Sequence, residues 1–256
     1  MMNRGNMEQK EILVLHGWMH SAARYRRFKK LMEAGEENLN LTLYEFPGFG
    51  NTKGRPGRGL LNCYARDLAL YLKEHNTDAV IAHSMGGAVL IRAVSSVELA
   101  KRPKIILINP AYHGIRKLLP AAFFFPVIWG VLALMKELPF CLSGPFYRTA
   151  ALLTINRRDQ IDDLILQDSR RADPLTAALL LGELALDRFR THADLGQVYL
   201  IVSGKDRVIS QRSVRLLEKD LKHVTRIDFP GIGHTPVVEA FSDLADCIRE
   251  LLDFTF

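Results

Sequence analysis

Short apolar runs alternate with longer stretches of helical spacing along most of the chain. Each run is nearly continuous in Ile, Val and Leu and is closely followed by Gly, Pro, Ser or Asp. Uninterrupted apolar strands are typical of a parallel sheet that helices cover on both faces. The runs predict strands over Glu11–Leu15, Leu41–Glu45, Ala79–Ala82, Ile105–Asn109, Val198–Val202 and Arg226–Phe229.

The stretches between these runs carry apolar residues three and four positions apart, as amphipathic helices do. They predict helices over Leu60–Glu74, Met85–Val97, Ser210–Lys219 and Phe241–Leu252. Strand and helix in alternation indicate an α/β fold with a mainly parallel sheet of about six strands, flanked by helices.

One region breaks this alternation. From Tyr112 to Leu195 the sequence has no convincing strand, only helix-like segments separated by prolines. We therefore expect an all-helical cap inserted after the fourth strand. The chain then divides into a core of residues 11–111 and 196–256 and a cap, or lid, of residues 112–195.

Within this insertion, residues 118–135 form 18 positions without a charge, which is long enough for a membrane span. Two early prolines disfavour a continuous helix, and a single crossing would split the sheet between two sides of a bilayer. Three interpretations remain: the segment lines an apolar pocket, rests on a membrane surface, or packs within the insertion. If its aromatic side chains face inward, Phe123, Phe124 and Trp129 are substrate-binding candidates.

Length and composition fit an ordinary globular protein. The chain has 256 residues, 48% of them hydrophobic, enough to bury a core without disulfides or metals. Its three cysteines are far apart and show no Cys-x-x-Cys spacing, which favours a reducing compartment and gives no thiolate metal site. Because the first ten residues are polar and the next apolar run is short, we expect a cytoplasmic protein.

The net charge of +6 attracts anionic partners in general. Its simplest interpretation is a solvated surface that like charge keeps soluble. An acidic carrier protein or a membrane surface remains a possible partner through the basic patches. No nucleic-acid motif accompanies the charge, so we expect no nucleic-acid binding.

The sharpest local motif surrounds Ser84. The predicted strand Ala79–Ala82 runs into His-Ser-Met-Gly-Gly, and a predicted helix begins at Met85. So tight a strand-to-helix turn forces its central residue into strained backbone angles and raises the side chain above the sheet. Ser84 is therefore the candidate nucleophile, the alternative being an ordinary Ser-Met-Gly-Gly turn.

A serine nucleophile needs a base, and the base needs a carboxylate to orient it. His234 lies in a Gly- and Pro-bounded loop just after the last predicted strand, and Asp206 follows the strand Val198–Val202. Because parallel strands end at the same edge of a sheet, Ser84, Asp206 and His234 are expected to meet there. They occur in the order nucleophile, acid, base.

The loop after the first strand, His16-Gly17-Trp18, is suited to an oxyanion hole. The backbone N–H groups of Trp18 and of Met85, the residue after the nucleophile, are its expected donors. His20, close to this loop, is a candidate pocket residue.

These blocks, together with Phe46-Pro47-Gly48-Phe49-Gly50, resemble the α/β-hydrolase fold superfamily in kind and order. The resemblance covers nearly all of the chain after the first ten residues and is greatest to serine carboxylesterases that carry a helical cap. Some of those cleave acyl-carrier methyl esters. Ala82 stands where the family usually has a glycine, although some lipases of the family share the alanine.

The motif and the resemblance together imply a serine hydrolase that cleaves a carboxylic ester or thioester, with a medium or long acyl chain, through an acyl-enzyme on Ser84. No metal or organic cofactor is expected. Two alternatives stay open: carbon–carbon bond hydrolysis or lyase chemistry on the same fold, and a non-catalytic ligand receptor. A polar pocket would favour the first alternative, and failure to label Ser84 with a phosphonate would favour the second.

Overall fold

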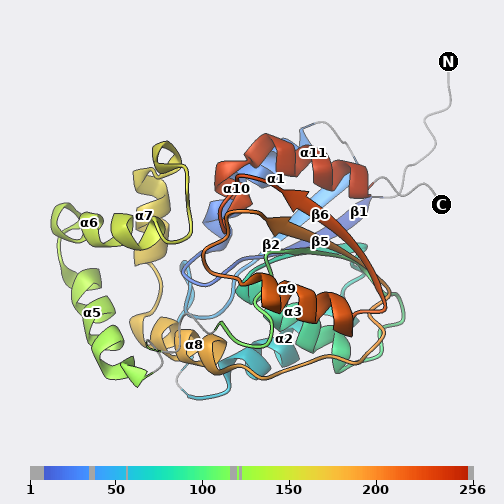
Figure 1. The fold of residues 1–256 in the computed structure, drawn as a ribbon, viewed down its shortest axis with the longest axis horizontal. Helices are drawn as coiled ribbons and strands as arrows, with labels where there is room; N and C mark the ends of the chain where they lie inside the picture. Colours follow the sequence, from blue (N-terminus) through green and yellow to red (C-terminus); the bar gives the residue numbers. More distant parts are fainter. Residues whose placement is uncertain (1–8, 35–37, 56, 116–119, 121–122, 253–256) are drawn as a thin grey trace.

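The computed structural model describes residues 9–34, 38–55, 57–115, 120 and 123–252. Its centre is a six-stranded sheet in which every neighbouring pair is parallel, in the order β2-β1-β3-β4-β5-β6. This confirms the predicted α/β class and strand number (Figure 1). The strands are β1 (Lys10–Leu15), β2 (Leu39–Tyr44), β3 (Ala79–His83), β4 (Lys104–Ile108), β5 (Gln197–Ser203) and β6 (His223–Phe229).

Burial across the sheet explains why the strands read as continuous apolar runs. All five residues of the central strand β3 are buried, and so are the last four of β1 and of β4. The edge strand β6 alternates between exposed and half-buried positions instead. Register brings the carboxyl ends of the central strands level, since Leu15 pairs with Ala82 and Ile108 pairs with both His83 and Ile201.

Helices cover both faces of the sheet (Figure 1). One apolar cluster joins the sheet to α2 and α3, and a second joins its other face to α1 and α11. The predicted bounds of α2 and α11 are those observed, whereas α1 was not among the predicted helices. The helices outside the β4–β5 connection are η1 (Ala22–Tyr25), α1 (Arg26–Glu33), α2 (Leu60–Glu74), α3 (Met85–Ser95), α9 (Gln211–Asp220), α10 (Pro236–Glu239) and α11 (Phe241–Leu252).

Between β4 and β5, every regular element in the described residues is a helix, joined to the next by short loops. Figure 1 shows the helices of this connection gathered at one end of the molecule, with α8 nearest the sheet and α5, α6 and α7 beyond it. No helix of the described residues is both long and apolar enough to span a membrane. The helices are α5 (Phe125–Glu137), α6 (Phe140–Ala151), η3 (Arg158–Gln160), α7 (Asp163–Arg170) and α8 (Pro174–Leu186).

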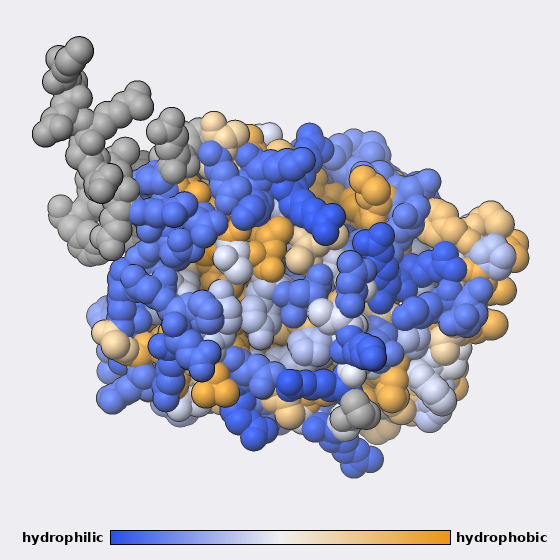
Figure 2. Space-filling view, turned by 180° about the vertical axis from the view of Figure 1, so that it is seen from behind, coloured by the Kyte–Doolittle hydropathy of each residue, from blue (hydrophilic) through white to orange (hydrophobic). Residues whose placement is uncertain are grey.

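Helix α5 takes up most of the uncharged segment 118–135, of which residues 118, 119, 121 and 122 lie outside the described part. Only Leu132 of this helix is buried. The exposed apolar side chains of α5 and its N-terminal flank contribute to the hydrophobic surface at this end of the molecule (Figure 2). They are Phe123, Phe124, Val127, Trp129, Val131 and Leu134.

Replacing Ile106 with alanine tests the central packing. Ile106 lies in β4 and is 0% exposed, so the truncation leaves a cavity and should lower the free energy of unfolding by about 2–5 kcal/mol. The matched control is Leu70→Ala on α2, where 57% exposure predicts a change of about 0.5 kcal/mol or less. Urea unfolding of both variants measures this, and equal losses would contradict the burial described here.

Candidate active site

Ser84 occupies a backbone conformation that L-residues rarely adopt. It links the end of β3 to the start of α3 with φ 51° and ψ −111°. The turn has no space for larger neighbours, because a Cβ on Gly86 would lie 2.8 Å from the His16 carbonyl oxygen and one on Gly87 2.7 Å from Pro110 Cβ. Such strain is typical of functional turns and holds the serine at the N-terminus of α3.

The structure brings the three predicted triad residues into one hydrogen-bonded chain. Ser84 Oγ lies 2.8 Å from His234 Nε2, and His234 Nδ1 lies 2.7 Å from Asp206 Oδ2. An ionised carboxylate only accepts hydrogen bonds, so the imidazole proton belongs on Nδ1 and Nε2 is left to accept the serine hydroxyl. The arrangement can therefore draw a proton from Ser84.

Asp206 is held in its ionised form. Burial acts to raise the pKa of its carboxyl, but the charge of His234 and the hydrogen bonds to the carboxylate together outweigh it, and the net pKa lies below the ordinary value. The N–H groups of Val208 and Ile209 also favour the carboxylate, donating to Oδ1 over 2.7 and 2.9 Å. One oxygen is thus fixed by the backbone while the other orients the histidine.

The main chain of His234 is held on both sides. Its N–H donates to the Thr154 carbonyl oxygen over 2.8 Å, and its own carbonyl oxygen accepts from His83 Nε2 at 2.8 Å and Asn109 Nδ2 at 3.0 Å. Asn109 in turn exchanges hydrogen bonds with Ser203 at the end of β5. The position of the imidazole therefore depends on residues from β3, β4 and the helical connection.

The sequence analysis did not identify the parts played by Thr154, Asn109 and His83. Asn109 had a recognisable feature: it is an amide residue directly at the carboxyl end of a central strand, followed by proline. Its φ of 43° suits asparagine better than most residues. Nothing in the local sequence marks Thr154, because it acts through its backbone carbonyl.

The loop after β1 lies directly against the nucleophile. A Cβ on Gly17 would be 2.8 Å from His83 Nδ1 and 3.3 Å from Ser84 Cβ, so a side chain here would crowd both residues. Trp18 follows, and its indole Nε1 donates to the Ala177 carbonyl oxygen over 2.8 Å. The N–H of Met85 belongs to the first turn of α3 and has no carbonyl partner within the helix. Met85 is thus the chain neighbour of Ser84, and Trp18 follows the glycine that packs against it; their role as oxyanion donors stays a prediction.

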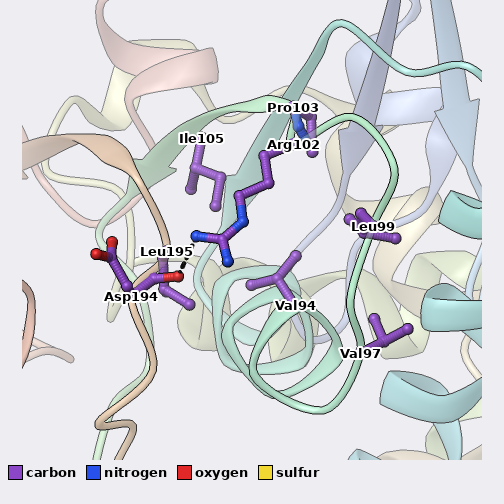
Figure 3. Close-up of a pocket in the computed structure, with 8 residues that line it drawn as sticks. All are labelled: Val94, Val97, Leu99, Arg102, Pro103, Ile105, Asp194 and Leu195. Atoms are coloured by element: carbon purple, nitrogen blue, oxygen red, sulfur yellow. Dashed lines mark hydrogen bonds between the residues drawn. The ribbon is translucent and has the colours of Figure 1, made fainter.

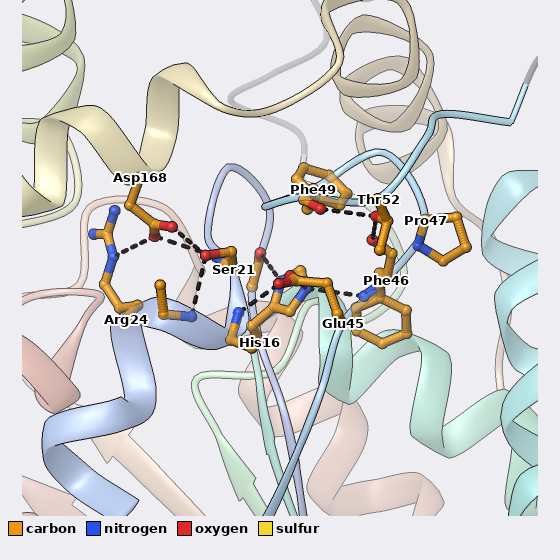
Figure 4. Close-up of polar contacts among 12 residues, drawn as sticks. His16, Ser21, Arg24, Glu45, Phe46, Pro47, Phe49, Thr52 and Asp168 are labelled. Carbon is orange, nitrogen blue, oxygen red and sulfur yellow. Dashed lines mark hydrogen bonds and ion pairs between the residues drawn. The ribbon is translucent and has the colours of Figure 1, made fainter.

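Polar contacts brace this loop from behind (Figure 4). The N–H of Phe46 donates to His16 Nε2 over 3.1 Å, which leaves the other ring nitrogen to bond the Gly17 carbonyl oxygen at 2.9 Å. Further along, Ser21 and Arg24 both bond to the buried carboxylate of Asp168 on α7. The loop is thus fixed to the core at its start and to the helical connection at its end.

A cavity of about 290 Å³ lies between this loop and the helical connection. Its lining is mainly apolar, with His20 among a few polar groups, and it takes Val127, Ile128, Val131 and Leu132 from α5. A second cavity, between α3, β4 and the chain before β5, measures only about 10 Å³ and is too small for a substrate (Figure 3).

The three substrate-binding residues expected on α5 and its flank lie outside the lining of the larger cavity. Phe123 and Phe124 are 79% and 61% exposed, Trp129 is 45% exposed, and none of the three lines the 290 Å³ cavity. On α5 itself, the apolar residues that line the cavity are Val127, Ile128, Val131 and Leu132 instead of Trp129. The predicted pocket residue His20 does line the cavity.

Two further histidines near the triad are neutral at physiological pH. Burial, followed by the charge of Arg24, lowers the pKa of His20 well below its ordinary value. Burial, followed by the charge of His234, lowers the pKa of His83 to about 3. Because Nε2 of His83 donates to a carbonyl oxygen, its Nδ1 is bare, and it is buried without a hydrogen-bond partner in the described part of the chain.

Among the described residues, no cluster of three or more His, Cys, Asp or Glu side chains could hold a metal ion.

Similarity to known proteins identifies the family of this chain. The sequence model of the alpha/beta hydrolase family matches residues 12–254, almost the entire chain. The chain belongs to the alpha/beta hydrolase family. No curated protein sequence matches it.

Solved structures share the fold at low sequence identity. An esterase from Thermogutta terrifontis is 17% identical with a TM-score of 0.72, covering 96% of this chain and 90% of that one. The enol-lactonase from Burkholderia xenovorans LB400 is 14% identical with a TM-score of 0.72, covering 98% and 93%. A 2-hydroxy-6-oxo-6-phenylhexa-2,4-dienoate hydrolase from Rhodococcus sp. strain RHA1 is 16% identical with a TM-score of 0.67, covering 94% and 90%. The likeness in fold therefore extends over nearly all of this chain.

Acid should destabilise the protein through His83. Between pH 6.5 and about 3 the unfolded histidine takes up a proton that the folded one does not, so the free energy of unfolding falls as the pH falls. In His83→Gln this contribution disappears, and the stability of the variant relative to wild type should rise by about 1.4 kcal/mol per pH unit below 6.5. Urea unfolding at several pH values measures the difference, and a pH-independent difference would contradict a neutral buried His83.

Proposed function

We propose that this alpha/beta hydrolase is a serine hydrolase that cleaves carboxylic esters or thioesters through an acyl-enzyme on Ser84. The observation that carries the proposal is the continuous hydrogen-bonded chain from Ser84 Oγ through His234 to Asp206. A serine, an imidazole and an ionised carboxylate in this order form a nucleophile with its base and orienting group.

In the first half of the reaction, Ser84 Oγ attacks the carbonyl carbon of the substrate while His234 Nε2 takes the hydroxyl proton. Asp206 stabilises the imidazolium that forms and remains ionised itself. The N–H groups of Trp18 and Met85 stabilise the oxyanion of the tetrahedral intermediate. His234 then returns the proton to the leaving alcohol or thiol as the carbon–oxygen or carbon–sulfur bond breaks.

In the second half, a water molecule attacks the acyl-enzyme with His234 again as the base. The same oxyanion donors serve the second tetrahedral intermediate. Its collapse breaks the bond to Ser84 Oγ, returns the proton to the serine and releases the carboxylic acid.

The mainly apolar cavity supports an acyl group with a hydrocarbon chain. Apolar side chains from α5, α6 and α8 line most of it. A volume of about 290 Å³ can hold an acyl chain of medium length. An apolar lining also argues against the more polar substrates of carbon–carbon bond hydrolysis or lyase chemistry, which remain the alternative on this fold.

Initial rates on p-nitrophenyl esters from acetate to dodecanoate test the reaction. Ser84→Ala should lower kcat/KM by about 1,000-fold or more, because the nucleophile is lost while the fold is kept. Mass spectrometry should show one phosphonate adduct on the wild-type protein and none on the variant. A wild-type protein that neither hydrolyses esters nor takes the label would instead be a ligand receptor.

Chain-length preference tests the cavity. Val131→Phe fills space in its lining and should shift the preferred ester to a shorter chain, with kcat/KM falling about fourfold for each methylene excluded. The matched control is Leu134→Phe on the same helix, 57% exposed and outside the lining, which should keep the wild-type profile. Parallel shifts in both variants, or in neither, would exclude this cavity as the acyl site.

A further inference from the structure

Glu239 is a buried carboxylate beside the triad loops that the proposed reaction does not use. It is the last residue of α10 and is 2% exposed. Its Oε1 accepts the N–H of Gly233 over 3.0 Å, and its Oε2 accepts the N–H groups of Asn156 and Arg157 over 3.0 and 3.1 Å. One side chain thus joins the loop of the candidate catalytic histidine to the chain that follows α6.

The chain after α6 also contacts both triad loops directly. The Thr154 carbonyl oxygen accepts the N–H of His234, and Asn156 Nδ2 donates to the carbonyl oxygen of Lys205, the residue before Asp206, over 3.2 Å. The histidine loop, the aspartate loop and the helical connection therefore meet at a single junction.

The junction is closely packed at Gly233. A Cβ on this residue would lie 2.4 Å from Glu239 Oε1 and 2.8 Å from the Thr154 carbonyl oxygen. Glu239 Oε1 accepts the N–H of Gly233, and the Thr154 carbonyl oxygen accepts the next N–H, that of His234. A change at either acceptor therefore displaces the backbone that carries the imidazole.

We infer that Glu239 is a positioning residue, whose carboxylate sets the place of His234 by binding the histidine loop to residues 156 and 157. This inference rests on the proposed function, since it concerns the base of that reaction. A carboxylate suits the role because it accepts from all three N–H groups and donates to none. The surrounding protein excludes water that could replace these bonds, and the same burial raises the pKa of Glu239.

Glu239→Gln changes this junction with almost no change in volume. A glutamine side chain has one acceptor oxygen, so its NH₂ group must face at least one backbone N–H, and two donors then oppose each other. The histidine loop should shift away from its bonded position. Because a small misplacement of a catalytic base slows the chemical step more than it weakens binding, kcat should fall while KM stays close to wild type.

Glu183 on α8 provides a matched control. Its Oε1 accepts the N–H groups of Gly59 and Leu60 over 2.6 and 2.9 Å, and its Oε2 accepts that of Leu61 over 2.9 Å. It therefore makes the same three-donor contact and ties the same helical connection to the core at the start of α2. None of its three donors belongs to a triad loop.

The experiment compares Glu239→Gln with Glu183→Gln in kcat, KM and thermal midpoint on a p-nitrophenyl ester. Both variants should lose stability, but only Glu239→Gln should lower kcat, by about 10- to 100-fold with little change in KM. Equal kcat in the two variants would overturn the inference while leaving the proposed function intact. Absence of esterase activity in the wild-type protein would overturn the proposed function.

Proton NMR gives a readout that needs no substrate. The Nδ1 proton between His234 and Asp206 should give a low-field resonance in the wild-type protein, assigned by its disappearance in His234→Ala. In Glu239→Gln this resonance should move or broaden through faster exchange with water, and in Glu183→Gln it should be unchanged. An unaltered resonance in Glu239→Gln would show that the carboxylate does not position His234.

Discussion

Backbone crowding at the turn between β3 and α3 is the constraint on which the site depends. Ser84 reaches its positive-φ conformation because the two glycines after it let the loop after β1 and the residues after β4 approach without side chains between them. The Ser84 N–H bonds the Ile108 carbonyl oxygen, and its own carbonyl oxygen accepts from Ala111. The nucleophile is therefore built into the sheet, and the other site residues are placed relative to it.

The sheet and the triad could be predicted from the sequence because both follow from short-range rules. A strand buried on two faces must be apolar throughout, and a tight turn above it must have small residues at fixed spacing. Ser84 follows β3 directly, Asp206 and His234 lie in the loops after β5 and β6, and parallel strands bring such positions to one edge. The distance between these residues along the chain did not hinder the prediction, because the parallel topology alone brings the strand ends together.

The lining of the cavity and the support of the histidine could not be predicted for two different reasons. Helix α5 is apolar almost all round, so its sequence does not define which face borders the cavity: Val127 lines it and Trp129, two positions on, does not. Thr154 bonds His234 through its backbone, which no residue type identifies. Glu239 lies five positions after His234, but its partners at residues 156 and 157 come from the helical connection.

Strands β4 and β5 are neighbours in the sheet although 88 residues separate the end of one from the start of the other. Because the two strands are parallel, the connection leaves at one end of the sheet and returns at the other, so beyond a length sufficient to cross, the sheet itself places no limit on its shape. The junction of Thr154 and Asn156 with the triad loops does place one. In a chimaera that replaced these helices with those of another family member, the transplanted segment would have to supply an acceptor for the His234 N–H. The helices between β4 and β5 can thus be exchanged within the fold only if the few main-chain hydrogen bonds at the site are kept.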